Sequence, residues 1–257
     1  MEKAMFPEGA ALVFGGSGGI GRSVAQSFAE AGADVAIGYH SKADAAQSLA
    51  SQIEAMGCKV SVHRGDVRDQ AQVEALFEAA VAAHGRVHTI VWAAGPLVDQ
   101  VMIGDMTHEQ WRRAIDTEVH GFFNAVQAAL PHFRARGGGS FVTLGSAGHM
   151  HWPEKDGLSV APKASNESLV RGIAKEEGRN NIRANSVLVG VIEAGMFLEL
   201  TRQGVFDTQW VAEVQKGLAL KRWGQPEEIG HAAVFLASNR AAYVTGQQIN
   251  VSGGYGI

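Results

Sequence analysis

The stretch GGSGGIG, residues 15–21, places five glycines in seven positions directly after the apolar run ALVF. An amphipathic pattern typical of a helix follows, from about Arg22 to Ala31. A strand, a glycine turn and a helix in this order leave backbone N–H groups and the positive end of a helix dipole open to a pyrophosphate. A glycine run alone would indicate only a tight turn, but this context predicts a dinucleotide site in the first strand–helix unit.

The rest of the chain repeats the alternation of short apolar runs with longer Ala-rich stretches. Strands are expected at DVAIGY, KVSVHRGDV, HTIVWAAG, GSFVTLGS and IRANSVLVG, and helices near 43–56, 70–84, 108–132 and 163–178. Parallel strands need crossover connections, so the alternation predicts an α/β protein: a single Rossmann-fold domain over residues 1–257, with a doubly wound parallel sheet and helices on both faces. The segment 193–220 fits poorly and is expected to be an insertion that covers a substrate cleft.

Composition excludes several classes of partner. The 257 residues are 46% hydrophobic and 19% charged, with a net charge of -4 and scattered Lys and Arg, so no nucleic-acid partner is expected. The single cysteine, Cys58, allows no internal disulfide and fits a reducing cytoplasm. No apolar run reaches the ~18 residues of a membrane span, and the N-terminus lacks a basic start before an apolar run. We expect a cytoplasmic protein with no membrane partner.

Several ordered motifs resemble the short-chain dehydrogenase/reductase (SDR) family. They are Gly15-x-x-x-Gly19-x-Gly21, Asp66 in GDV, Ala94-Gly95, Asn185, and the C-terminal runs RWGQPEEIGHAAVFLAS and YVTGQQINVSGG. These C-terminal runs resemble bacterial 3-oxoacyl-carrier-protein reductases. The resemblance covers essentially the whole chain and implies a nicotinamide-dependent oxidoreductase that acts on a small molecule and forms a homo-oligomer, usually a homotetramer.

The resemblance also assigns a cofactor site. Asp66 is expected to receive the adenine. The other positions expected to hold the cofactor are Gly15, Ser17, Gly18, Gly19, Ile20, Gly21, His40, Ser41, Lys42, Val67, Ala93, Ala94, Gly95, Lys163, Gly190 and Ile192.

The end of the second strand favours NADP(H) over NAD(H). An acidic side chain there would accept hydrogen bonds from a ribose 2′-hydroxyl, but this chain has Tyr39, His40, Ser41 and Lys42. No acid is placed to repel a 2′-phosphate, and Ser41 with Lys42 could bind one. A solvated loop with an ordinary surface lysine is the alternative.

The catalytic relay of the family is only half present. Related enzymes use an Asn, a Ser, a Tyr and a Lys, of which the Ser matches Ser146 and the Lys matches Lys163. The Tyr position holds Ser159, and the Asn position holds Glu118. A serine hydroxyl has a pKa far above that of a phenol, so Ser159 cannot replace the tyrosine as a general acid. It could still orient a carbonyl group or a water.

Five further departures fall near the nicotinamide end. Phe14 stands where the family has Thr, Trp92 and Ala93 where it has Asn-Asn, Val189 where it has Pro, and Ala194 where it has the Thr that contacts the nicotinamide amide. The adenine end keeps its motifs. We therefore interpret the nicotinamide end as rebuilt.

Other groups must then supply the proton. His149 and His151 follow Ser146 directly in GHMHWPEKD, which also contributes Glu154 and Asp156, although two histidines in a polar loop are often plain surface residues. His-x-His resembles a metal pair without a convincing third ligand, so no metal is predicted.

Glu118 and Tyr255 complete the set of candidate groups. Glu118 is expected to be buried beside Lys163 as an ion pair, or else to be a solvated acid on a helix face. Of the three tyrosines, Tyr255 near the C-terminus is the one that could approach a site, and then the site of a neighbouring subunit in an oligomer.

Three functions are compatible with this pattern. The first is the reduction of conjugated C=C bonds, because 2,4-dienoyl-CoA reductases resemble the chain in having Ser four residues before the Lys. The second is carbonyl or alcohol oxidoreduction with His149, His151 or Glu118 as the acid. The third is a nucleotide-binding sensor, partner subunit or non-redox catalyst. Apolar residues in 196–220 indicate either a lid over a partly apolar substrate or plain helix packing.

Overall fold

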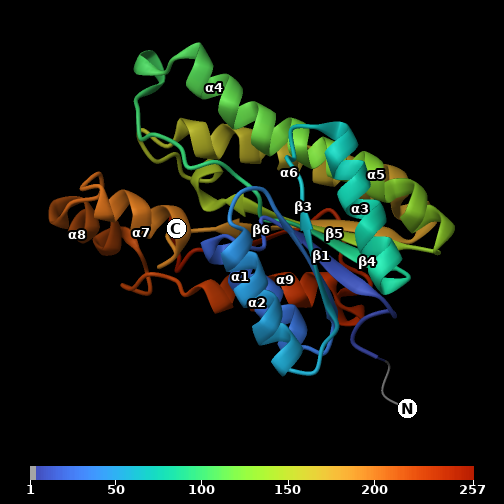
Figure 1. The fold of residues 1–257 in the computed structure, drawn as a ribbon. Helices are drawn as coiled ribbons and strands as arrows, with labels where there is room; N and C mark the ends of the chain where they lie inside the picture. The colour runs from blue at the N-terminus through green and yellow to red at the C-terminus, as the bar shows by residue number, and fades with distance from the viewer. Residues whose placement is uncertain (1–3) are drawn as a thin grey trace.

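The computed structural model describes residues 4–257, so the first three residues of the expected 1–257 domain lie outside it. A seven-stranded sheet in the order β3-β2-β1-β4-β5-β6-β7 runs through the centre of the molecule, and every neighbouring pair is parallel (Figure 1). The strands are β1 (Ala10–Phe14), β2 (Asp34–Tyr39), β3 (Val60–Arg64), β4 (Val87–Trp92), β5 (Gly139–Ser146), β6 (Ile182–Val189) and β7 (Gln248–Val251).

Helices cover both faces of the sheet (Figure 1). On one face lie α1 (Gly19–Glu30), α2 (Ala43–Ala55) and α9 (Pro226–Ala237), and on the other α3 (Gln70–His84), α5 (Gly121–Ala135) and α6 (Gly157–Glu177). Each face has its own apolar core, which explains why the central strands are continuous apolar runs: all five residues of β1 are buried. The doubly wound α/β fold predicted from the sequence is confirmed.

The helix expected over 108–132 contains an irregular turn. It consists of α4 (His108–Ile115), a π-helical turn (Asp116–His120) and α5. A π-turn inserts one residue into the helical repeat, and such turns are frequent at functional sites. This one contains Glu118, whose side chain is buried.

The helix expected at 163–178 begins six residues earlier, at Gly157. Its first turn is fixed by the Asp156 carbonyl, which accepts the backbone N–H groups of Ser159 and Val160. Pro162 lies inside the helix, and a proline usually suggests a boundary, which explains the late start expected from the sequence. As a result Ser159 and Lys163 lie one helical turn apart on the same face.

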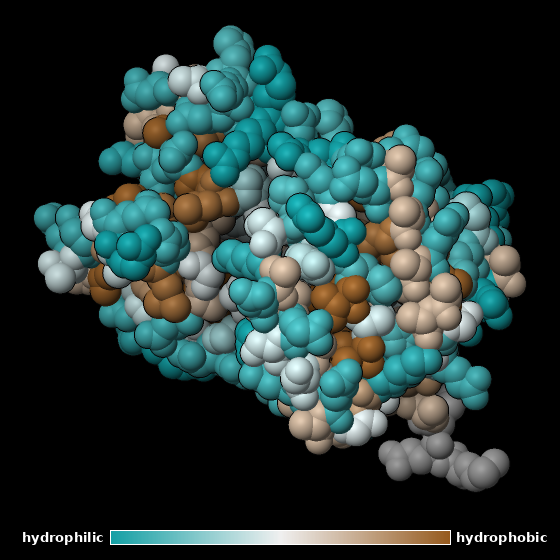
Figure 2. Space-filling model, viewed as in Figure 1, coloured by the Kyte–Doolittle hydropathy of each residue, from teal (hydrophilic) through white to brown (hydrophobic). Residues whose placement is uncertain are grey.

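The segment 193–220 forms two short helices, α7 (Gly195–Arg202) and α8 (Thr208–Gly217), beyond one end of the sheet and close to the C-terminus (Figure 1). We call this segment the lid. Hydrophobic residues gather around it on the surface (Figure 2). Among the described residues, no helix is both long and apolar enough to cross a membrane.

Candidate active site

A cavity of about 580 Å³ lies between the start of α6, the loops after β5 and β6, the lid and the C-terminal tail. It lies at the carboxyl ends of the parallel strands, where ligands bind in open α/β sheets. Its wall contains the candidate residues Ser146, His151, Ser159, Lys163, Ile20, Gly190 and Ile192. The lid contributes apolar side chains, namely Met196, Phe197, Phe206, Trp210 and Val214.

Ser146 stands at the end of β5, where its hydroxyl accepts the N–H of Gly148 over 3.0 Å. Ser159 and Lys163 face the same cavity from α6. The structure therefore brings together the two relay residues that the sequence retains and the serine that replaces the tyrosine. Two hydroxyl groups and an ammonium group border one space.

Lys163 forms an ion pair with Glu118, as the sequence suggests. Glu118 is 2% exposed, and its second carboxylate oxygen accepts the indole N–H of Trp92 over 3.3 Å. Asn166 donates to the Glu118 backbone carbonyl over 2.9 Å and so holds the π-turn against α6. Gly95 must lack a side chain, because a Cβ there would lie 2.5 Å from the carboxylate. Lys163 thus lines the cavity, while its ion-pair partner Glu118 lies outside the cavity wall.

The two loop histidines have different surroundings. The His149 ring points to the buried carboxylate of Glu167, with Nδ1 2.8 Å from Oε2, and to the Ser146 carbonyl at 3.0 Å. Burial raises the pKa of Glu167 to about 7. Glu167 also accepts the Ser146 N–H over 3.3 Å, so the pair supports the strand end that carries Ser146. His149 is therefore directed away from the cavity that His151 lines.

His151 faces the cavity beside two further ionisable groups. Its ring meets the Tyr255 ring edge-on, with centroids 5.4 Å apart. Asp156 also lines the cavity, and burial raises the pKa of its carboxyl group while Gln100 donates to it over 3.0 Å. Tyr255 lines the cavity of its own chain, whereas the sequence indicated an approach to a neighbouring subunit's site.

The glycine turn has the shape that a dinucleotide pyrophosphate requires. Gly15 has φ +78°, and a Cβ on it would lie 2.6 Å from the Ala93 carbonyl oxygen. Gly19 lies so close to the backbone of Gly195 that a side chain would clash with it. Both α1 and α7 begin here without a side-chain cap, so their first N–H groups are available to an anion. The residues present fit a nicotinamide dinucleotide.

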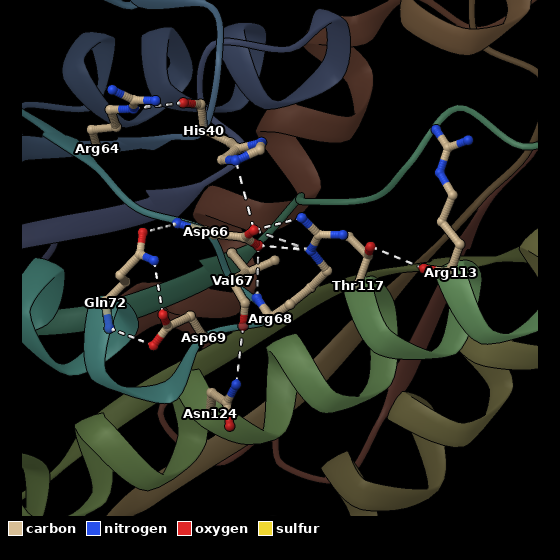
Figure 3. A network of polar contacts seen from close by, with 10 residues as sticks. All are labelled: His40, Arg64, Asp66, Val67, Arg68, Asp69, Gln72, Arg113, Thr117 and Asn124. Carbon is tan, nitrogen blue, oxygen red and sulfur yellow. Dashed lines mark hydrogen bonds and ion pairs between the residues drawn. The ribbon is translucent and has the colours of Figure 1, made fainter.

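A network of polar contacts lies at the carboxyl ends of β2 and β3, where Arg64 and Arg68 lie close to His40 and Asp66 (Figure 3). Arg68 binds the Asp66 carboxylate through two nitrogens, at 2.9 and 2.6 Å, and His40 lies 3.7 Å from it. The hydrogen bonds from Arg68 lower the pKa of Asp66 to about 2. Arg64 donates to the His40 carbonyl over 3.2 Å, and Asn124 donates to the Val67 carbonyl over 3.0 Å.

Comparison with known proteins agrees with this geometry. A family model described as "Enoyl-(Acyl carrier protein) reductase" matches residues 15–256. The chain is 36% identical over 249 residues to 3-oxoacyl-[acyl-carrier-protein] reductase FabG of Chlamydia muridarum (strain MoPn / Nigg), covering 95% of this chain and 96% of that protein. The chain belongs to the short-chain dehydrogenase/reductase family. It resembles the 3-oxoacyl-carrier-protein reductases of that family.

Two further relatives show the range of the family. L-rhamnose 1-dehydrogenase (NAD(P)(+)) of Sphingomonas sp. (strain SKA58) is 35% identical over 244 residues, covering 95% of this chain and 94% of that protein. A 7α-hydroxysteroid dehydrogenase solved with NADH and 7-oxo glycochenodeoxycholic acid superimposes with a TM-score of 0.89 at 30% identity, covering 98% of this chain and 96% of that one.

Three of the departures from the SDR pattern, at Phe14, Trp92 and Glu118, are in contact with one another. Trp92 and Phe14 are almost fully buried with ring centroids 5.5 Å apart, and the Phe122 ring lies 5.7 Å from that of Trp92. The indole N–H of Trp92 donates to Glu118, which pairs with Lys163. Val189, Ala194 and Ser159 instead line the cavity.

Sequence reasoning did not single out several residues of the site. Arg64 is adjacent to Tyr39 in the register of β2 and β3, so strand pairing could have indicated it. Arg68 and Glu167 have no signal of that kind. Among the residues described, no group of three or more His, Cys, Asp or Glu side chains is arranged to hold a metal ion.

Proposed function

We propose that this SDR protein is an NADP(H)-dependent oxidoreductase that reduces a carbonyl or a conjugated enone or enoyl substrate, with a proton donor other than the usual tyrosine. The observation that carries the proposal is the cavity in which Ser146, Ser159 and Lys163 meet beside the glycine turn.

The residues that would hold the cofactor extend along one groove. The N–H groups at the start of α1 would bind the pyrophosphate, and Asp66 with Val67 would face the adenine. A bound reduced nicotinamide supplies a hydride. The basic side chains of Lys42 and Arg64 at the adenosine end support a 2′-phosphate and therefore NADP(H).

The hydroxyl groups of Ser146 and Ser159 would donate hydrogen bonds to the oxygen on which negative charge develops. Such donors in a cavity shielded from water stabilise an oxyanion more than they do in bulk water. This role suits both a ketone and an enone, because both develop charge on oxygen. The ionisable side chains of the cavity wall that could supply the proton are His151, Glu154, Asp156 and Tyr255.

The substrate is expected to be partly apolar. The rings of Phe206 and Trp210 stack with centroids 3.9 Å apart, and Phe197 lies 5.9 Å from Phe206. These rings border the cavity opposite the hydroxyl groups. An apolar wall facing a few polar groups is the usual composition of a small-molecule site.

A second candidate function is a nucleotide-binding protein without redox activity, as a sensor, partner subunit or dehydratase-like enzyme. The ion pair between Glu118 and Lys163 favours this second function, because the pair occupies the lysine ammonium group that the family uses in its relay.

The proposed function is tested by following NADPH oxidation with a panel of ketones and enones. We expect turnover with at least one apolar member, and Lys163→Ala to reduce it. Tight NADPH binding with no oxidation across the panel would support the second candidate. A Ser159→Tyr variant that gains ketone reduction would show that the remaining scaffold is competent.

The family resemblance also supports a homotetramer in a reducing cytoplasm. The single cysteine, Cys58, is compatible with that compartment. Light scattering on the purified protein measures the assembly, and a mass of four chains is expected.

A further inference from the structure

The C-terminal tail is shaped to enter the active-site cavity. After β7 three glycines adopt positive φ values: Gly253 (+64°), Gly254 (+81°) and Gly256 (+80°). Side chains at the last two would be too close to their surroundings, since a Cβ on Gly254 would lie 2.6 Å from Ala219 and one on Gly256 2.6 Å from His151. The tail therefore fits closely between the end of the lid and the loop after β5.

These glycines flank Tyr255 and direct its ring into the cavity. Its backbone N–H is held by the Ser252 hydroxyl at 3.2 Å, and its ring stands edge-on to His151 at an interplanar angle of 78°. It shares the cavity wall with Ser159 and Lys163. Burial and then the charge of Asp156 raise the pKa of Tyr255, so the phenol stays protonated at neutral pH.

Two of the donors suggested by the sequence are paired outside the cavity wall. The Glu118 carboxylate is paired with Lys163, and the His149 ring with Glu167. Of the other two tyrosines, Tyr243 is fully exposed and Tyr39 ends β2 at the adenosine side. Tyr255 is therefore the phenol that the fold brings to the cavity.

We infer that Tyr255 is the catalytic proton donor, entering from the tail in place of the tyrosine that position 159 lacks. The inference rests on the proposed function. As hydride from the reduced nicotinamide bonds to the carbonyl carbon, the C=O π pair moves to oxygen, the phenolic O–H breaks, and its proton goes to that oxygen. A proton from solvent then returns to the phenolate.

The first test measures position and does not depend on turnover. The chain has three tyrosines, so ¹³Cζ-tyrosine NMR resolves each one, with Tyr→Phe variants giving the assignment. Saturation with NADP⁺ is expected to shift the Tyr255 resonance and lower its pKa by roughly one unit or more, because a positive ring approaches the phenol. The Tyr243 resonance should not move. A Tyr255 signal unchanged at saturation would overturn the inference.

The second test measures the proton transfer. Tyr255→Phe is expected to lower kcat roughly 10²-fold or more, keep the NADPH Kd within about two-fold, and change the alkaline limb of the kcat/KM pH profile. Tyr243→Phe is the matched control and should match the wild type. If the wild type turns over and Tyr255→Phe does so equally, Tyr255 is not the donor and the proposed function stands. If Tyr255 responds to NADP⁺ but the wild type transfers no hydride, the proposed function fails and the donor role with it.

Discussion

At the scale of residues, the buried ion pair between Glu118 and Lys163 is a departure from the family pattern at the relay lysine. Replacing one partner leaves the other charge buried, which costs far more than replacing both. Glu118→Gln should therefore lower the free energy of unfolding by about 3 kcal/mol in urea titrations. The double variant Glu118→Gln with Lys163→Met is the control and should recover much of that loss. Equal stability of Glu118→Gln and the wild type would show that the pair is not a buried ion pair in solution.

Glu167 gives a prediction for pH dependence. Its pKa rises from the ordinary 4.5 to about 7 in the folded protein, so between these values the native state binds more protons than the unfolded chain. Stability should therefore fall as pH rises through this interval, by at most about 1.4 kcal/mol per pH unit from this group. His149, Lys163 and Arg171 are the charged or titratable groups that act on it.

The measurement is thermal or urea unfolding of the wild type and Glu167→Gln from pH 4.5 to pH 7. The variant should show a flatter profile over that range, because the amide does not titrate. A profile with the same slope in both proteins would assign the pH dependence to other groups.

Residue patterns indicated the relay substitutions but could not separate His149 from His151. The two histidines are two positions apart, and the short 3₁₀ turn at Ala147–His149 directs the first toward Glu167. That outcome depends on the buried carboxylate of α6, which local sequence does not connect to the loop. The burial of Glu118 was foreseeable only because the family places that position beside the site.

At the scale of elements, the glycine turn contacts the start of α7, so we expect cofactor binding to be coupled to the lid. A Cβ on Gly19 would clash with the Gly195 backbone. Gly19→Ala is expected to weaken NADPH binding at least about ten-fold, measured by quenching of protein fluorescence, because it separates the lid from the turn. Gly172→Ala, where a Cβ meets nothing within 4 Å, is the control and should bind normally. Normal affinity in Gly19→Ala would contradict the coupling.

The aromatic stack of the lid should act on substrate binding. Trp210→Ala removes the ring stacked on Phe206, and we expect KM for an apolar substrate to rise about ten-fold with a smaller change in kcat. Trp111→Ala, on the half-exposed face of α4 outside the cavity, is the control. A fall in kcat without a change in KM would instead place Trp210 in the chemical step.

Periodicity identified most helices and strands, because buried strands and amphipathic helices have strong local patterns. It failed where tertiary contacts override the local signal. The helix α6 starts at Gly157 and continues through Pro162, where a sequence reading would place a boundary. The π-turn at Asp116–His120 is held by hydrogen bonds from Asn166 and Trp92 to Glu118. Neither feature has a sequence signal of its own.

At the scale of the whole molecule, the two apolar cores and the parallel sheet place every candidate group at one end of the strands. The alternation of strands and helices predicted the parallel sheet and its covering helices correctly. The path of the C-terminal tail was not predictable, since three glycines with positive φ allow many routes, and only the packed lid and loop select the one observed.

The most direct test of the proposed oxidoreductase uses NADPH deuterated at C4 with the ketone and enone panel, followed by mass spectrometry of the products. An oxidoreductase of the proposed kind gives a reduced product that carries deuterium at the carbon attacked, and the position of the label distinguishes C=O from C=C reduction. NADPH that binds at saturation but leaves every panel member unlabelled would contradict the proposed oxidoreductase function.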